Sequence, residues 1–160
     1  MKHKQLHTNH LSNIYINKFI DDTKKIGKTL ILSYNDYLKF NFSKNISNKY
    51  KTIILINVLN KVEDYEDTLF KFTDFVKVGG RIIGTVSSFA EIDDNNWGFT
   101  SESVRYLLDK IVGIKNRKVH TFGNVLAGRY LLNNKIKEDI NNELIFKTDK
   151  HFPVIIGFRY

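Results

Sequence analysis

The sequence contains no cysteine and a single proline, and it has no long hydrophobic run. Without cysteine, the chain can form no disulfide, no thiolate metal site and no cysteine nucleophile. No apolar stretch approaches the roughly 20 residues that a membrane-spanning helix needs, and the polar, basic N-terminus lacks a signal-peptide pattern. These absences predict a soluble, cytoplasmic protein that does not associate with membranes.

Familiar catalytic patterns are also missing. There is no serine-nucleophile motif, no phosphate-binding loop and no zinc-ligand spacing. His3, His7 and His10 are spaced for one face of a helix, but they stand in a polar segment with no carboxylate nearby. We therefore expect no metal site.

The composition is that of one globular domain: 160 residues, of which 42% are hydrophobic and 26% charged. The formal net charge of +8 makes nucleic-acid binding conceivable. However, the lysines are spread along the whole chain, with no basic block and no arginine cluster. A basic RNA-binding module, with an affinity that falls steeply with salt, therefore stays as an alternative that is not favoured.

Hydrophobic periodicity predicts strands that alternate with helices after a polar tail at residues 1–11. Capping signals place helix starts at Asp64 and Thr100, and the Gly79–Gly80 pair is expected to end the first of these helices. Residues 34–51 show no clear period and are expected to form a loop. Strands are expected at 29–33, 52–57, 81–86, 118–122 and 153–158, with 144–147 a possible partner, and further helices at 13–25, 125–132 and 135–142. This order predicts one α/β domain over residues 12–160, with a mostly parallel sheet and a C-terminal antiparallel strand.

Several segments resemble one protein family, in order and spacing. The run 58–65, the later 76–83 (VKVGGRII) and the segment 96–100 (NWGFT) resemble the middle of class I S-adenosylmethionine-dependent methyltransferases. The last segment, with 123–128 and 149–153, is similar to the small methyltransferases associated with cell-surface polysaccharide synthesis. The resemblance covers residues 50–160 and implies a Rossmann-like methyltransferase fold and S-adenosylmethionine as the cofactor.

The part of the family pattern that holds this cofactor is not found. Family members begin with a strand and a loop of closely spaced glycines, which lets the backbone approach the cofactor. Here no glycine occurs between Gly27 and Gly79, and Lys51 stands where the family usually has an acidic residue. The resemblance thus implies a truncated family member, inactive alone, whose binding of the cofactor is doubtful.

The resemblance also suggests site residues. Asn57, Asn60 and Lys61 stand where the family's strand end faces the cofactor, although a solvated loop would look the same. Asp93 and Asp94 follow the next expected strand, where a carboxylate could act as a general base, but Asp-Asp-Asn-Asn is also an ordinary turn.

Trp97 and Thr100 are the candidates for substrate binding. Trp97 and Phe99 could stack on a sugar or base, or anchor the following helix in the core. The expected function is that of an incomplete methyltransferase-like protein, related to enzymes that modify sugars or small molecules. The alternative is a non-catalytic interaction subunit, a homodimer or the partner of an active enzyme. A missing neighbour would leave the edge of strand 52–57 exposed, or covered only by strand 29–33.

Overall fold

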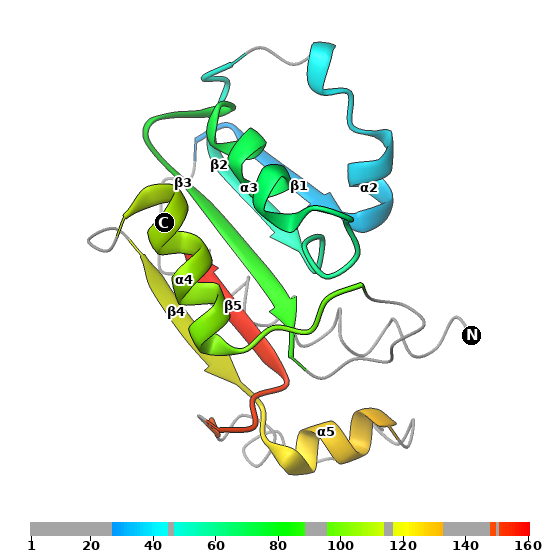
Figure 1. Ribbon diagram of the computed structural model, residues 1–160. Helices are drawn as coiled ribbons and strands as arrows, with labels where there is room; N and C mark the ends of the chain where they lie inside the picture. The colour runs from blue at the N-terminus through cyan, green and yellow to red at the C-terminus, as the bar shows by residue number, and fades with distance from the viewer. Residues whose placement is uncertain (1–26, 45–46, 89–95, 114–116, 133–147, 150) are drawn as a thin grey trace.

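The computed structural model describes residues 27–44, 47–88, 96–113, 117–132, 148–149 and 151–160 (Figure 1). In this part of the chain, five strands form one sheet in the order β1-β2-β3-β5-β4. The expected helices at 13–25 and 135–142 and the possible strand at 144–147 lie outside the described residues. So do the polar tail and its three histidines.

Four of the five strands point the same way. β1 (Thr29–Ser33), β2 (Tyr50–Ile56) and β3 (Val76–Ser87) pair in parallel. β5 (Ile155–Arg159) lies antiparallel between β3 and β4 (Lys118–Phe122). The predicted α/β fold, with a mostly parallel sheet and an antiparallel C-terminal strand, is confirmed.

The longer helices begin at the residues that the capping signals indicate. α3 (Tyr65–Thr73) starts after Asp64, whose carboxylate accepts a hydrogen bond of 2.9 Å from the Asp67 amide. α4 (Ser101–Val112) starts after Thr100 and stops at Gly113. α5 (Val125–Leu132) follows β4. None of the described helices has the length and apolarity that crossing a bilayer requires.

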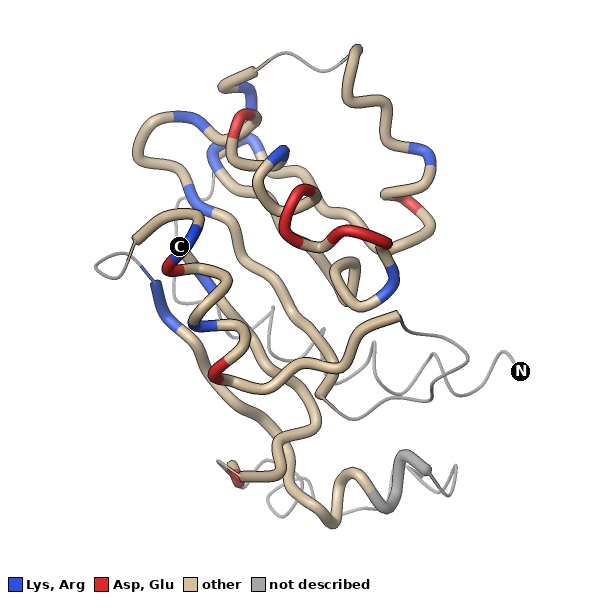
Figure 2. Tube along the Cα trace, viewed as in Figure 1, with Lys and Arg blue, Asp and Glu red and all other residues tan. Residues whose placement is uncertain are grey.

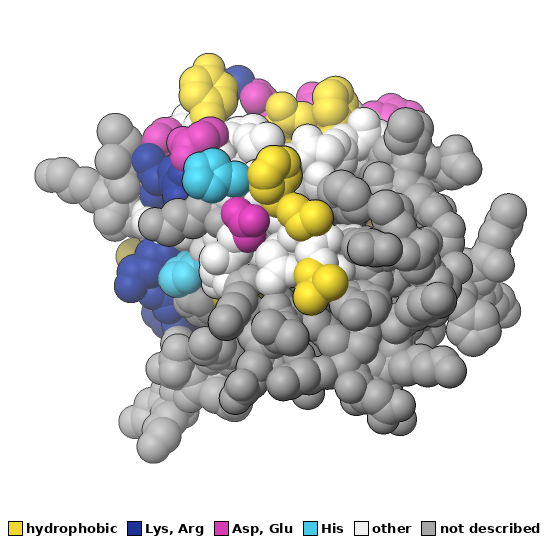
Figure 3. Space-filling model, turned by 90° about the horizontal axis from the view of Figure 1, so that it is seen from below, with side chains coloured by type: hydrophobic (Ala, Val, Ile, Leu, Met, Phe, Trp, Pro, Cys, Tyr) yellow, Lys and Arg dark blue, Asp and Glu magenta, His cyan; other side chains and the backbone are white. Residues whose placement is uncertain are grey.

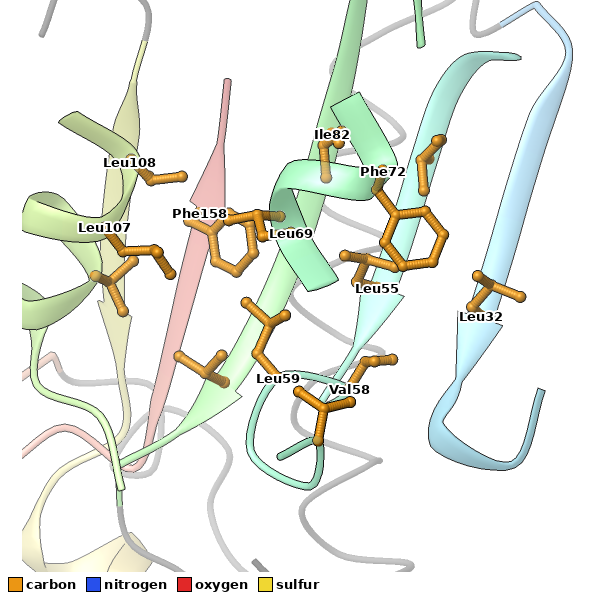
Figure 4. Close-up of a cluster of buried hydrophobic side chains, with 14 of the residues drawn as sticks. Leu32, Leu55, Val58, Leu59, Leu69, Phe72, Ile82, Leu107, Leu108 and Phe158 are labelled. Carbon is orange, nitrogen blue, oxygen red and sulfur yellow. The ribbon is translucent and has the colours of Figure 1, made fainter. Parts of the chain in front are cut away.

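The main core lies between the sheet and helices α3 and α4, which both cover the same face (Figure 4). Because side chains alternate along a strand, every second residue points toward these helices. Leu69 and Phe72 of α3 and Leu107 and Leu108 of α4 pack onto this layer, and all four are almost fully buried. On the strands, the buried residues that face them include Leu32, Leu55, Ile82 and Phe158.

The expected role of the glycine pair was wrong. α3 ends at Thr73, and Gly79 and Gly80 lie inside β3. Gly79 has a φ of +66°, and a Cβ on Gly80 would come within 2.8 Å of the main-chain oxygen of Lys51. The glycines therefore serve a close approach of two strands, at the shift in register between Tyr50 and Thr52.

The expected loop at 34–51 was also wrong in part. α2 (Tyr34–Lys39) and a 3-10 turn (Phe42–Lys44) follow β1, and β2 already begins at Tyr50. The segment is held by aromatic contacts rather than by a periodic apolar stripe. The rings of Phe40 and Phe42 lie 5.6 Å and 5.3 Å from the ring of Phe72 on α3. Contacts with a distant helix are invisible to a local pattern, which explains the error.

Candidate functional site

The carboxyl ends of β1, β2 and β3 meet at one edge of the sheet, where Rossmann-like folds bind their ligands. Figure 3 views the molecule from this side: hydrophobic, acidic and histidine side chains occupy the described surface, and most of the visible basic atoms lie at the left margin. Asn57, Asn60 and Lys61 follow β2 at this edge, as expected. The structure brings Trp97 next to them.

Asn60 is fully buried and joins three segments of the edge. Its side-chain amide donates to the main-chain oxygens of Ser87 (2.9 Å) and Trp97 (2.8 Å). Its side-chain oxygen accepts from the Ser87 amide at 2.9 Å. Both amide hydrogens are thus used within the chain, so this side chain holds the edge together and offers a ligand little more than its oxygen.

Asn57 has a left-handed backbone, with a φ of +50°, and is nearly buried. Its side-chain oxygen accepts a hydrogen bond of 3.1 Å from the Thr85 hydroxyl, and its main-chain N–H donates to the Thr85 carbonyl at 3.0 Å. Asparagine tolerates this conformation better than most residues, because its short polar side chain bonds locally. Asn57 therefore shapes the end of β2.

Lys61 differs from Asn57 and Asn60 in that its side chain reaches toward the end of β1 rather than toward β3. Its ammonium lies 5.6 Å from the ring centroid of Tyr34, the first residue of α2. Such a cation–π contact contributes about 0.5–1 kcal/mol at a partly exposed site. The pair presents one positive charge and one aromatic face at the carboxyl edge.

Trp97 and Thr100 are both engaged by the chain itself. The Trp97 indole donates to the Val62 carbonyl at 2.8 Å, its ring meets Tyr65 edge to face, and 40% of the residue stays exposed. The Thr100 hydroxyl accepts from the Ser103 amide at 3.1 Å as the cap of α4. Phe99 is buried against Tyr65, so the interpretation of this aromatic as a core anchor holds.

The turn after β1 leaves no room for a glycine loop. β1 ends at Ser33 and α2 begins at Tyr34. The Ser33 hydroxyl and amide both donate to the Asp36 carboxylate, at 2.5 Å and 3.0 Å. The hydroxyl hydrogen bond and then the amide hydrogen bond hold the pKa of this carboxyl below its ordinary value. The helix start is therefore closed by its own side chains.

These residues fit S-adenosylmethionine poorly. The backbone cradle of the family needs glycines between strand and helix, and none stands between β1 and α2. Asp93 and Asp94, the predicted general bases, lie outside the described residues.

Sequence reasoning missed two polar residues at this edge. Tyr34 stacks against Tyr37 and faces Lys61, and Ser87 is 2% exposed with a hydroxyl that has no hydrogen-bond partner among the described residues. Both stand at the ends of strands that the sequence predicted. Their position after an apolar run was the available signal.

Comparison with solved structures identifies the fold. No protein-family model and no curated protein sequence matches the chain. Among solved structures, a SAM-dependent methyltransferase from Archaeoglobus fulgidus has a TM-score of 0.59 at 9% identity, over 94% of this chain and 93% of that one.

Two further solved structures with a similar fold are also methyltransferases. A SAM-dependent methyltransferase from Thermotoga maritima, a possible histamine N-methyltransferase, has a TM-score of 0.51 at 14% identity over 72% of this chain. The match spans 57% of the length of that protein. A putative methyltransferase in complex with the Haloferax volcanii Trm112 activator has a TM-score of 0.51 at 12% identity, over 91% of this chain and 76% of that one. The protein therefore has the Rossmann-like fold of class I SAM-dependent methyltransferases.

Proposed function

We propose that the protein is a methyltransferase-like protein, related to enzymes that modify sugars or small molecules, whose own chain does not complete the SAM site. The observation that carries this proposal is the direct passage from β1 into α2 through the Ser33–Asp36 capping box. A cofactor carboxylate or ribose would have to displace these hydrogen bonds and would find no glycine backbone behind them.

The carboxyl edge supports the same proposal. The side-chain amide of Asn60 donates both of its hydrogens, to the main-chain oxygens of Ser87 and Trp97. The side-chain oxygen of Asn57 accepts a hydrogen bond from the Thr85 hydroxyl. What the edge retains is the charge of Lys61 beside the ring of Tyr34. A site of this kind orients an anionic or ring-shaped group but does not hold a nucleoside. Methyl transfer, which consists largely of holding the acceptor in line with the methyl group, then requires a second chain that supplies the missing part.

Calorimetric titration of the purified protein with SAM and S-adenosylhomocysteine tests the proposal. We expect no binding heat up to roughly millimolar ligand, since a site without its backbone cradle loses most of its affinity. Circular dichroism on the same sample shows that the protein is folded. A Kd near the micromolar range that weakens in Lys61→Ala would overturn the proposal. Lys39→Ala, which removes an exposed lysine on α2, is the matched control.

A second candidate function is that of an interaction subunit, and one observation favours it. β1 is at the end of the described sheet, with β2 on one side only, and Ile31 in its middle is 55% exposed. The backbone groups of an edge strand can pair with a strand of another chain. In one similar structure, a putative methyltransferase is in complex with the Trm112 methyltransferase activator. We propose that β1 is the contact for a second copy or for a partner enzyme.

A further inference from the structure

Basic side chains gather at the opposite edge of the sheet, where the parallel strands begin. Figure 2 shows the blue segments concentrated at the upper left, near the amino ends of the strands. We call this group the basic edge. Along the chain, its members stand just before β1, near the start of β2, in the first half of β3, at the start of β4 and at the end of β5: Lys28, Lys51, Lys77, Arg81, Lys118 and Arg159.

The strand pairing places these residues side by side. The Lys28 carbonyl accepts a 2.8 Å hydrogen bond from the Lys51 amide, and the Lys51 ammonium donates to the Gly79 carbonyl. Arg81 is paired with Thr52, the residue after Lys51. Lys118 and Arg159 stand directly opposite each other on β4 and β5. Two cations in one cross-strand pair repel each other, so this arrangement costs stability.

Two lysines elsewhere on the described surface are paired with carboxylates, whereas several basic residues of the basic edge are not. Lys71 pairs with Asp67 and Lys110 with Glu66. Hydrogen bonds to these carboxylates raise the pKa of both ammonium groups. Within the part of the chain that the structure describes, Lys77, Arg81 and Lys118 form no ion pair.

The acidic residues near the basic edge do not change this balance. Asp109 is held by Arg117, which donates to it at 2.9 Å, so this pair is neutral as a whole. Asp74, the C-cap of α3, is a further carboxylate at this end, and it leaves the basic residues in excess. The first turn of α3, with Glu66 and Asp67, lies at the opposite end of that helix. The two ends of the sheet therefore differ in charge.

The shape of the basic edge fits a chain of phosphates better than a single one. Five strands at about 4.8 Å spacing make an edge of about 19 Å. This length covers roughly five phosphates of one strand of a nucleic acid duplex. Val78 is 97% exposed at the tip beside Lys77, and Tyr50 is buried with the Lys28 and Lys49 ammonium groups 5.8 Å and 5.4 Å from its ring.

We propose that the basic edge binds the phosphodiester backbone of a nucleic acid, without reading its base sequence. The positive charges supply electrostatic attraction and the release of counterions. Tyr50 is buried, so it is not a platform for base stacking, which favours contacts to phosphates over contacts to bases. A membrane surface would need an apolar anchor besides the charges, and Val78 alone is a small one. This site is at the far end of the sheet from the carboxyl edge and does not depend on the proposed function.

Fluorescence anisotropy with a labelled oligouridylate of roughly 20 nucleotides, the matching oligothymidylate and a duplex tests the proposal. We expect binding at about 50 mM salt that weakens as salt is raised, with a slope of log K against log salt near −2 for about three phosphate contacts to a single strand. Comparison of the three probes distinguishes RNA, single-stranded DNA and duplex as the source of the phosphates.

Single charge reversals locate the site. Lys77→Glu and Lys118→Glu change exposed residues whose side chains form no ion pair among the described residues. Each should lower the affinity by about three- to tenfold and reduce the salt slope by about 0.7. Lys39→Glu, exposed on α2, changes the net charge equally and should leave the affinity within about twofold. Equal weakening by all three variants would overturn the proposal. So would no binding to any probe, or binding only to phosphatidylserine vesicles.

Discussion

Asn60 connects three segments at the carboxyl edge of the sheet and is fully buried. Substitution to alanine would leave the Ser87 amide and the Trp97 carbonyl without their partner. An unsatisfied buried polar group costs about 1–3 kcal/mol. We expect Asn60→Ala to lower the free energy of unfolding by about 3 kcal/mol, measured by urea denaturation.

The neighbouring Asn96 offers a matched control for that measurement. Its side chain donates a single 3.0 Å hydrogen bond to the Lys61 carbonyl, and the residue is exposed. Asn96→Ala should therefore cost no more than about 0.5 kcal/mol. Equal losses in the two variants would mean that burial of Asn60 does not matter, which would contradict the role assigned to it.

Tyr160 makes the free energy of unfolding depend on pH in the alkaline range. Its hydroxyl is buried without a partner among the described residues, and this burial raises the pKa of the phenol well above its ordinary value of 10.0. Above that pH the unfolded chain releases the proton and the folded chain keeps it. Stability is therefore complete below pH 10 and falls at higher pH, by about 1.4 kcal/mol per pH unit.

A phenylalanine at this position tests the effect. Tyr160→Phe has no proton to release, so its stability should fall less steeply than that of the wild type above about pH 10. Below that pH the variant should be equally stable or slightly more so, because the lost hydroxyl had no partner. Thermal unfolding between neutral and alkaline pH compares the two proteins. Parallel curves over the whole range would show that Tyr160 is not buried.

At the scale of elements, β3 and β5 are joined through a glycine under an aromatic ring. A Cβ on Gly84 would lie 2.1 Å from Cζ of Phe158, which is in the core. Gly84→Ala must push this ring away and separate β5 from β3. We expect a loss of about 3 kcal/mol in the free energy of unfolding, measured by chemical denaturation.

Gly98 is the control for the loss of a glycine as such. Nothing lies within 4 Å of a Cβ built on it, so Gly98→Ala should change stability by no more than about 0.5 kcal/mol, and in the stabilising direction. If Gly84→Ala proved as harmless as Gly98→Ala, the packing of Phe158 over β3 would be incorrect.

The elements themselves were predicted well where their signals are local. The strands at 29–33 and 118–122 and the helix at 125–132 have the expected bounds. The caps at Asp64 and Thr100 also stand where they were expected, because a cap depends on residues three positions apart. α2 was missed, since its aromatic residues pack on Phe72 of a distant helix. The glycine pair was misinterpreted as a helix end, because the reason for glycine there is the close approach of the neighbouring strand β2.

For the whole molecule, the exposed strand β1 makes oligomeric state the decisive property. The proposed contact through β1 predicts a mass above that of one chain by light scattering at micromolar concentration. Ile31→Lys places a charge in the middle of β1 and should return the protein to a monomer. Phe70→Lys, which changes a residue 57% exposed on α3, should have no effect. A monomeric wild type would contradict self-association, and a mass unchanged by Ile31→Lys would place the contact elsewhere.

The sequence by itself determined the order of strands and helices, the caps and the α/β fold, since these follow from periodicity and from residues a few positions apart. It also predicted that Asn57, Asn60 and Lys61 stand at the carboxyl edge, but it missed Tyr34 and Ser87 there. Only the tertiary structure decided that the Asn60 side chain forms hydrogen bonds within the chain. It also showed that Ser33 bonds to Asp36 at the start of α2, directly after β1. It likewise gathered lysines that are scattered in sequence onto one edge, because parallel strands bring their amino ends together.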